Sequence, residues 1–305
     1  MRLYILKRKI KTFSKSPIVL LKKIWMLFEP ITTDEFYLKV SFLLNVGYWP
    51  NLKEPKSFNE KLQWLKLHHK CSGYTQMVDK VEAKKVVASI IGEKYIIPTI
   101  GVWDSVDEID WNSLPSQFVI KAAHDSGGVV ICKDITKLNI EYAKQLLRGT
   151  GKKDYTRFNK EYPYYKVPHR IIAEQYMVDE SGIELKDYKF FCFNGEPKYV
   201  QIDFDRFQNH RRNIYDINWN LLDLKIKFSK GHDRVFPKPE NYEEMINVSR
   251  RLSQGIPHVR VDLYNVNGKI YFGEMTFFHG SGMEQFTPLK WDYIFGDNLI
   301  LPITQ

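Results

Sequence analysis

The stretch Val259–Thr276, VRVDLYNVNGKIYFGEMT, decides the fold of the second half of this chain. Its two runs of β-branched and aromatic residues flank the turn Asn265-Val266-Asn267-Gly268, and this pattern predicts a β-hairpin. Asp262 leaves the first strand where Glu274 leaves the second, and Arg260 stands two residues before Asp262. Paired carboxylates of this kind are the hard oxygen ligands that Mg²⁺ uses beside substrate phosphates. The alternative is a structural hairpin with two solvated carboxylates.

Length and composition are those of a soluble globular protein with a sizeable core. The chain has 305 residues, of which 44% are hydrophobic, 14% aromatic and 27% charged, enough for one large or two ordinary domains. Eight of its 45 basic residues precede the first acidic residue, Glu29, and the remaining 37 nearly balance the 36 acidic residues. The body therefore lacks the basic surface of a nucleic-acid-binding protein, and we expect no nucleic-acid partner.

The first 28 residues form a basic amphipathic pattern. On a helical wheel, Lys11, Lys15 and Lys22 lie opposite Leu20, Leu21, Ile24, Leu27 and Phe28. Such a helix suits an anionic membrane surface, and the alternative is a surface helix docked on the domain. The segment has neither the ~20 apolar residues needed to span a bilayer nor a signal-peptide pattern. Three cysteines without CxxC spacing, Cys71, Cys132 and Cys192, indicate reduced thiols. We expect a cytoplasmic location, with the inner face of the cytoplasmic membrane as one interpretation.

The order of the elements predicts the fold class α+β. Ser57-Phe58-Asn59-Glu60 is a capping-box pattern that opens a helix through about His69, and a second helix is expected from Thr75 to Ile91. A third is expected over 139–148. From Arg170 onward the pattern is mostly that of strands, interrupted by one helix around 242–252. Helices followed by mixed elements with antiparallel hairpins favour α+β over an alternating parallel sheet.

A candidate phosphate-binding segment lies in the middle of the chain. Lys121 ends an apolar strand just before Ser126-Gly127-Gly128, and a further strand follows. Backbone N–H groups of a glycine pair can approach phosphate oxygens, while a strand lysine offers a point charge to the same group. The segment lacks the Walker A spacing. The alternative is a tight hairpin without a ligand.

A second candidate segment begins at the strand Ile171–Met177 and continues to Asp187-Tyr188-Lys189. The free backbone groups where a strand ends can bind an adenine edge, and an acidic residue shortly afterwards can hold ribose hydroxyls. The pattern is unremarkable when it is taken alone.

The order of these segments along the chain is more informative than any one of them alone. The chain resembles the ATP-grasp superfamily, and within it the TupA-like family named for teichuronopeptide biosynthesis, over roughly residues 45 to 300. The segments that carry the resemblance are Ser57–Lys66, Asp79-Lys80 with Lys84, Phe118–Lys133, Arg170–Tyr176, Asp187–Gly195, Asp203–Phe207 and Val259–Ser281.

The resemblance implies an ATP-grasp fold, in which two α+β subdomains clasp ATP after a helical N-terminal region. The implied parts are a basic amphipathic helix region (1–45), a helical part (46–115), a small subdomain with the phosphate lid (116–173) and a C-terminal subdomain with the Mg²⁺ site (174–305).

The resemblance also implies roles for individual residues. The nucleotide-binding residues are Lys80, Lys121, Ser126, Gly127, Gly128, Glu174, Met177, Asp187 and Lys189. Of these, Lys121 contacts the α- and β-phosphates, Glu174 and Met177 sit at the adenine hinge, and Asp187 faces the ribose. Asp262 and Glu274 bind Mg²⁺, while Arg260 stabilises the transferring phosphoryl group. Where the superfamily commonly has Asn as a third metal-proximal residue, this chain has Thr276, a weaker ligand.

The activity that the resemblance implies is ATP- and Mg²⁺-dependent ligation of a carboxylate to an amine through an acyl phosphate. For the TupA-like family the implied partners are an amino acid and a uronic-acid-containing saccharide of a bacterial surface polysaccharide. We expect the loop Asp205–Asn213, with Arg206 and Arg212, to hold the anionic acceptor or the phosphates. Its alternative is a solvated basic loop.

Two other functions compete with the ligase. Asp203-Phe204-Asp205 is a D-x-D pattern after an apolar strand, as in glycosyltransferases that use nucleotide sugars. The third hypothesis is a non-catalytic assembly protein that docks through its basic helix, although such a scaffold would not need the four charged residues Lys121, Arg260, Asp262 and Glu274.

Overall fold

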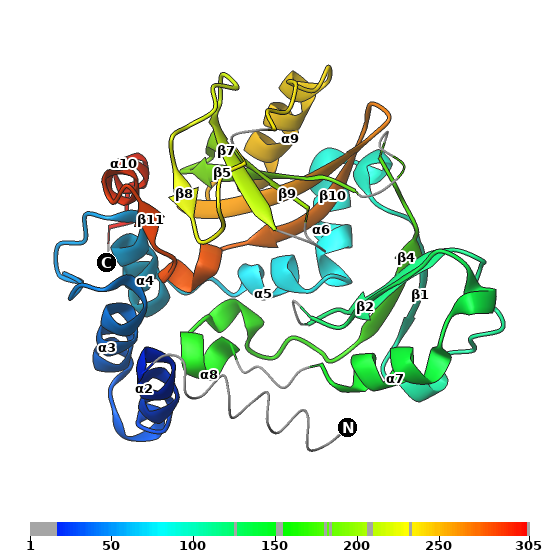
Figure 1. Ribbon diagram of the computed structural model, residues 1–305, viewed down its shortest axis with the longest axis horizontal. Coiled ribbons are helices and arrows are strands. Elements are labelled where there is room, and N and C mark those ends of the chain that lie inside the picture. The colour runs from blue at the N-terminus through cyan, green and yellow to red at the C-terminus, as the bar shows by residue number, and fades with distance from the viewer. Residues whose placement is uncertain are drawn as a thin grey trace.

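The computed structural model describes residues 17–124, 127–150, 155–179, 182, 185–205, 210–231 and 234–303 (Figure 1). Within these residues the fold is a mixed α+β arrangement built on antiparallel sheets, as the order of elements predicted. The predicted Ser126 and Arg206, and residues 1–16, lie outside the described residues.

Two sheets form the frame. Sheet A has the strand order β1-β4-β2-β3, made of β1 (Thr99–Trp103), β4 (Ile171–Gln175), β2 (Phe118–Ala122) and β3 (Val129–Cys132). Sheet B has the order β10-β9-β5-β6-β7, made of β10 (Lys269–Thr276), β9 (His258–Val266), β5 (Asp187–Phe193), β6 (Glu196–Phe204) and β7 (Arg211–Asp216). A short pair joins β8 (Lys225–Ile226) to β11 (Phe286–Thr287).

The helices lie around these sheets. Their bounds are α2 (Pro17–Met26), α3 (Asp34–Val46), α4 (Phe58–His68), α5 (Gly73–Val78), α6 (Glu82–Ile91), α7 (Ile140–Arg148), α8 (Tyr155–Asn159), α9 (Tyr242–Ser253) and α10 (Lys290–Asn298). The short 3-10 turns are η1 (Glu29–Ile31), η2 (Glu93–Tyr95), η3 (Val106–Glu108), η4 (Ile135–Lys137), η5 (Tyr162–Tyr164) and η6 (His279–Gly282). In Figure 1, α5 and α6 lie between the two sheets, while α2, α3, α4 and α10 gather at the side of sheet B away from sheet A.

Helix α4 confirms the capping-box prediction. The Ser57 hydroxyl accepts from the Glu60 N–H at 3.2 Å, and the Glu60 carboxylate accepts from the Ser57 N–H at 3.0 Å. This reciprocal pair satisfies N–H groups that the first helical turn leaves without partners. The buried ring of Phe58 then packs edge-on against Phe193 of β5, with 5.8 Å between ring centroids. The cap therefore fixes where α4 meets sheet B.

The helix predicted from Thr75 to Ile91 is wrong as a single element. It is broken between Val78 and Glu82, where the Asp79 carboxylate accepts from the Val81 N–H at 2.9 Å. An Asp side chain that bonds to nearby backbone in this way competes with helical hydrogen bonding. Arg170, the residue before β4, also donates to Asp79, at 2.5 Å. This bond from the neighbouring strand stabilises the break in the helix.

The two sheets have separate apolar cores. The far face of sheet B, with Phe190 and Val261, packs against Tyr242 and Met245 of α9 in the larger core. The outer face of sheet A packs against α7 in the smaller core. The larger core also reaches the other face of sheet B, where Phe191 and Phe193 pack against Phe58 of α4 beside Arg260.

His258 is a neutral histidine inside the larger core. Its Nδ1 lies 2.9 Å from the Cys192 carbonyl oxygen, and its ring lies against Phe58 and Phe193. Burial lowers the pKa of His258 from 6.5 to about 3. Between these values the unfolded chain binds a proton that the folded chain does not, so stability falls as the pH falls.

We expect this histidine to make the protein sensitive to acid. Between pH ~7.5 and pH ~5, His258 should remove about 2 kcal/mol from the free energy of unfolding. Urea titrations at the two pH values measure the loss, and His258→Gln should reduce it by about that amount. The exposed His68→Gln is the matched control, which should keep the wild-type loss. An unchanged loss in His258→Gln would contradict the assignment.

Helix α2 packs on α3 and remains partly exposed along its whole length. Trp25 donates from Nε1 to Ser41 of α3 at 3.0 Å and stacks on Tyr37 with 5.6 Å between centroids. None of the ten residues of α2 is buried. No helix in the described part of the chain is long and apolar enough to cross a membrane.

Candidate functional site

The hairpin formed by β9 and β10 carries a bulge at Gly273. Phe272 pairs with Leu263, and the next paired residue of β10 is Glu274, which lies opposite Asp262. A one-residue slip exchanges the two faces of a strand, so Glu274 turns to the side of Asp262 instead of the apolar core. A Cβ at position 273 would lie 3.0 Å from the Asp262 carbonyl oxygen, which favours glycine there. The predicted pairing of Asp262 with Glu274 is confirmed, and it depends on the bulge.

Arg260 is the centre of the resulting cluster. Its guanidinium donates to both carboxylate oxygens of Asp262 at 2.7 Å. The same group reaches Glu274 at 3.0 Å and the Thr276 hydroxyl at 3.1 Å. Lys189 of β5 also donates to Asp262, and its Nζ lies 3.2 Å from Asp187. Four predicted site residues on β9 and β10, and two on β5, thus come together on one face of sheet B.

The charges in this cluster keep Glu274 ionised. Burial alone would raise the pKa of Glu274, but the charges of Lys189 and Arg260 outweigh it and lower the pKa to about 2. The Glu274 side chain is 43% exposed, whereas that of Asp262 is 1% exposed. Burial raises the pKa of Asp262, and its two cationic partners oppose that rise. Glu274 is therefore the carboxylate that a ligand reaches from solvent.

The donor set fits a magnesium ion shared with a phosphorylated ligand. Asp262, Glu274 and Thr276 supply hard oxygens on one face, the chemistry that Mg²⁺ prefers. Within the described residues, no group of three or more His, Cys, Asp or Glu side chains is placed to hold a metal. Mg²⁺ is commonly held by one or two carboxylates with phosphate oxygens and water, so two carboxylates suffice only with such partners.

Sheet A presents a second charged group. Lys121 of β2 and Lys84 of α6 contact the two oxygens of Glu174 at 2.5 and 2.6 Å. Burial would raise the pKa of Glu174, but the two lysines lower it overall. Lys121 therefore meets the predicted adenine-hinge residue directly. Val129, the cross-strand neighbour of Lys121, is exposed on the same face and offers an apolar surface beside the lysines.

A cavity adjoins this group, between α6, η2 and β1. It encloses about 520 Å³ and is lined by residues that include Lys84, Val102 and Ile172. This size is typical of small-molecule sites.

The other predicted nucleotide-binding residues are spread around these two groups. Gly127 and Gly128 lie in the β2–β3 hairpin, where Gly128 has a φ of 63°. Met177 follows β4 and is half-buried. The Lys80 N–H donates to the Ala123 carbonyl oxygen at 3.3 Å, which places Lys80 at the end of β2.

Arg212 belongs to a polar row beside the Arg260 cluster. It donates to Asp203 at 2.7 Å and to Glu284 at 3.5 Å. Glu284 also accepts from Lys227 at 2.8 Å. Burial works against ionisation of Glu284, but His279 and Lys227 hold its pKa well below its usual range. The row is thus a set of charges that neutralise one another.

His279 links this row to Arg260. Arg260 donates to Nδ1 of His279 at 2.9 Å, and Nε2 of the same ring lies 3.4 Å from Glu284. Burial lowers the pKa of His279 to about 4, so the ring is neutral at neutral pH. Sequence patterns did not predict a role for Lys227 or Glu284, which lie outside the segments that carry the resemblance, or for His279, which lies inside Val259–Ser281 without a recognisable spacing.

A buried lysine on α4 holds the turn that follows the hairpin. Lys66 donates to the carbonyl and the hydroxyl of Ser281 at 2.8 and 2.9 Å, and to Gln63 at 3.1 Å. Burial lowers the pKa of Lys66 to about 8. Gly280, Ser281 and Gly282 all have positive φ, so their backbone needs such outside support. This turn, η6, begins with His279 and so belongs to the site.

Comparison with known proteins identifies a family. The family model described as TupA-like ATPgrasp matches residues 60–300. No curated protein matches the chain. Similar solved structures include D-alanine–D-alanine ligase from Bacillus anthracis complexed with ATP, at 16% identity and TM-score 0.38, over 66% of this chain and 53% of that one.

Two further solved structures are similar to parts of the chain. D-alanine–D-alanine ligase from Helicobacter pylori has 13% identity and TM-score 0.42, over 80% of this chain and 70% of that one. N5-carboxyaminoimidazole synthetase from Staphylococcus aureus has 14% identity and TM-score 0.38, over 66% of this chain and 44% of that one. The chain spans about half the length of the first two solved structures that it matches, 53% and 44%.

Proposed function

Because this chain belongs to the TupA-like ATP-grasp family, we propose that it is an ATP- and Mg²⁺-dependent ligase joining a carboxylate to an amine. The observation that carries the proposal is the cluster in which Arg260 contacts Asp262, Glu274 and Thr276 on one face of sheet B. A carboxylate is a poor electrophile at neutral pH. Its phosphorylation by ATP gives an acyl phosphate, whose phosphate is a good leaving group for an attacking amine.

The nucleotide would lie between residues 116–173 and 174–305. Lys121 and Lys80 supply positive charge to its phosphates, and Gly127 and Gly128, with the predicted Ser126, cover them. Glu174 and Met177 line the base end, and Asp187 and Lys189 stand at the ribose end. Sheet A also includes β1, so the small subdomain would use Thr99–Trp103 as well. Lys84, which shares Glu174 with Lys121, joins this set.

Each charged group of the cluster then has a task. Mg²⁺, when bound through Asp262 and Glu274, would neutralise phosphate charge during transfer. Arg260 is within reach of both carboxylates, so its guanidinium can stabilise the transferring phosphoryl group and the oxyanion that forms on amine attack. These tasks need no nucleophile from the protein.

The polar row is the proposed acceptor site. Arg212 and Lys227, with the predicted Arg206, supply positive charge for an anionic acceptor, and the ionised Glu284 suits an ammonium group. An amino acid and a uronic-acid-containing saccharide carry these charges. We therefore propose an amide between them, in bacterial surface polysaccharide biosynthesis, as the product.

The D-x-D alternative has less support from the geometry. Asp203 is bonded to Arg212, and Asp205 accepts from Arg211 at 2.6 Å. These two carboxylates are bonded to different arginines, whereas Asp262 and Glu274 both contact the single guanidinium of Arg260.

Nucleotide turnover tests the proposed function. Purified protein with ATP and Mg²⁺ should release ADP and phosphate faster when an amino acid and a uronic-acid saccharide are both present, and mass spectrometry should find the amide. Binding of a sugar nucleotide without ATP turnover would support a glycosyltransferase instead, and binding of neither would support a scaffold.

We also propose that α2 and η1 bring the enzyme to anionic membranes. Leu27 and Ile31 are 75% and 78% exposed, and Lys22 and Lys23 precede them on α2. An apolar surface with flanking lysines is the pattern of a helix that lies in the membrane interface, where each lysine adds about 1 kcal/mol.

The double variant Leu27→Asp with Ile31→Asp should lose most of its binding to phosphatidylglycerol vesicles at low salt. Its ATP binding and thermal stability should stay unchanged, because both residues are exposed. Vesicle co-sedimentation measures the loss, and the exposed Val235→Asp is the matched control, which should bind like wild type. Equal sedimentation of the two variants would show that α2 is a structural helix only.

A further inference from the structure

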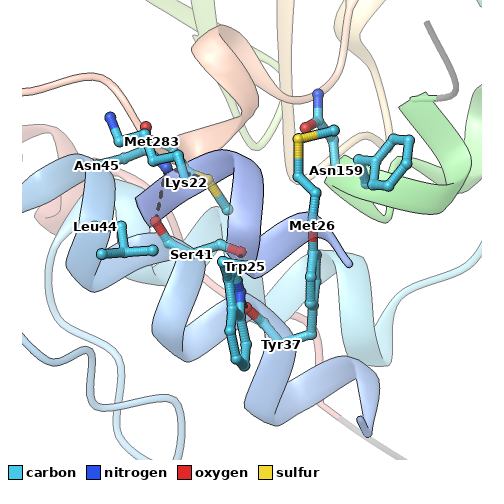
Figure 2. A pocket seen from close by; sticks show the side chains of 10 residues that line it. Lys22, Trp25, Met26, Tyr37, Ser41, Leu44, Asn45, Asn159 and Met283 are labelled. Atoms are coloured by element: carbon cyan, nitrogen blue, oxygen red, sulfur yellow. Dashed lines mark hydrogen bonds between the residues drawn. The ribbon is translucent and has the colours of Figure 1, made fainter. Parts of the chain in front are cut away.

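An apolar cavity lies between α2, α3, α8 and the residue that follows η6 (Figure 2). It encloses about 210 Å³, and its walls include Trp25 and Met26 of α2, Leu44 of α3, and Met283. In Figure 2, Lys22 and Met283 lie together at one end of the cavity. The cavity thus has an apolar interior and a cation at one end.

Met283, in the cavity wall, directly precedes Glu284 of the proposed acceptor site in the chain. Met283 accepts from the Asn45 side chain at 3.6 Å, and Gln285 donates to the Asn45 carbonyl oxygen at 3.0 Å. Glu284 stands between these two residues and bonds to Arg212 and Lys227. The backbone that forms this end of the cavity therefore also carries Glu284 of the row that would bind the saccharide.

The opposite side of the cavity is formed by the helix with the exposed apolar surface. Leu20, Leu21 and Ile24 of α2 are 44%, 51% and 43% exposed, and the same helix contributes Trp25 and Met26 to the cavity wall. One helix thus separates the proposed membrane surface from an apolar space beside the acceptor site. A group of exposed apolar side chains on one helix marks an interaction surface, and within the described residues nothing buries these three.

We propose that this cavity binds the hydrocarbon chain of an acceptor whose saccharide is joined to that chain through phosphate. This inference rests on the proposed function and names the class of its acceptor. Lys22 meets the phosphate, Trp25, Met26 and Leu44 hold the first part of the chain, and the saccharide extends past Met283 to Arg212.

The size of the cavity selects this occupant over a protein segment. A volume of about 210 Å³ takes roughly seven groups the size of a water molecule or a methylene, which suits a chain but not the side of a helix. The cation at its end adds charge complementarity for a phosphate, whereas a second copy of this chain would bring the like-charged Lys22 and Lys23 together.

Binding of short-chain probes tests the proposal. Calorimetry with farnesyl diphosphate, with myristoyl lysophosphatidic acid and with inorganic diphosphate compares a prenyl chain, an acyl chain and the head group alone. We expect at least one chain-bearing probe to bind ten times or more tighter than inorganic diphosphate. The tighter of the two identifies the source of the chain.

Two pairs of variants locate the binding. Leu44→Trp fills the cavity and should lower the affinity for the chain-bearing probe at least tenfold. Leu43→Trp, one residue away and 39% exposed, should leave that affinity unchanged. Lys22→Met should lower the same affinity about fivefold, and Lys23→Met should have no effect on it. ATP affinity and thermal stability, measured on the same samples, should be unchanged in all four.

The results separate the cavity assignment from the proposed function. Probes that bind no better than inorganic diphosphate, or that bind Leu44→Trp as well as Leu43→Trp, overturn the cavity assignment. If ATP-dependent ligation of soluble acceptors persists in that case, the proposed function stands without it. Chain binding that Leu44→Trp abolishes, in a protein without ligase activity, supports the cavity and contradicts the proposed function.

Discussion

Glu274→Gln is expected to lower ATP-dependent turnover by about 100-fold or more and to leave the fold intact. The change removes a charge without changing volume, and the side chain is 43% exposed, so no buried packing is lost. Mg²⁺ binds an anionic carboxylate oxygen strongly, whereas the amide of glutamine is neutral and offers a single carbonyl oxygen. Arg260 keeps its two bonds to Asp262, which preserves the rest of the cluster.

Phosphate release with saturating ATP measures this effect, and circular dichroism with thermal unfolding checks the fold. Glu243→Gln on α9 is a matched control, since Glu243 is an exposed carboxylate paired with Lys238 away from the cluster. Wild-type turnover in Glu274→Gln would remove the metal assignment, and with it the role given to Asp262.

Lys121→Met is expected to weaken ATP binding by roughly 10- to 150-fold, which corresponds to the loss of about 1.5–3 kcal/mol for a charged hydrogen bond. The buried Glu174 keeps Lys84 at 2.6 Å, so the substitution does not leave that carboxylate without a cation. Loss of affinity should therefore exceed loss of stability. Methionine also retains most of the apolar stem of the lysine.

Titration with ATP by calorimetry measures the change, and Lys85→Met is the control because Lys85 is largely exposed on the same helix as Lys84. Equal ATP affinity in Lys121→Met and Lys85→Met would show that Lys121 serves only to neutralise Glu174. A large loss of stability with unchanged affinity would point the same way.

Local patterns in the sequence predicted the elements that depend on neighbouring residues. The α4 cap joins residues three apart, and the β-hairpin joins its strands across Asn267 and Gly268 alone, since the predicted turn residues Asn265 and Val266 belong to β9; both features could be recognised without the fold. The bulge had a local signal as well, a glycine inside a strand, but its consequence for Glu274 appears only once the register is known. The pairing of Asp262 with Glu274 was therefore predicted for an incomplete reason.

Long-range contacts account for what sequence patterns did not predict. Lys66 and Ser281 are 215 residues apart, and Arg212 and Glu284 are 72 apart. Neither pair has a spacing that marks it, because the packing of α4 on sheet B brings together the first pair, and the pairing of β8 with β11 brings Glu284 toward β7. The break in the helix from Thr75 to Ile91 has the same origin, since Arg170 of the neighbouring β4 segment contributes to it.

The bond from Lys66 to the η6 turn has a consequence for how this protein can be divided. Helix α4 precedes both sheets in the chain, yet its lysine and Gln63 hold the backbone of Ser281 and Gly282 beside His279. The helical region is thus not a detachable adaptor that could be exchanged between relatives to change their acceptor. A chimera joined between α4 and β1 would take sheet B and the η6 turn from one parent. It would take α4, which supports that turn, from the other parent. We expect such a chimera to fold at η6 only where both parents have a lysine at the position of Lys66.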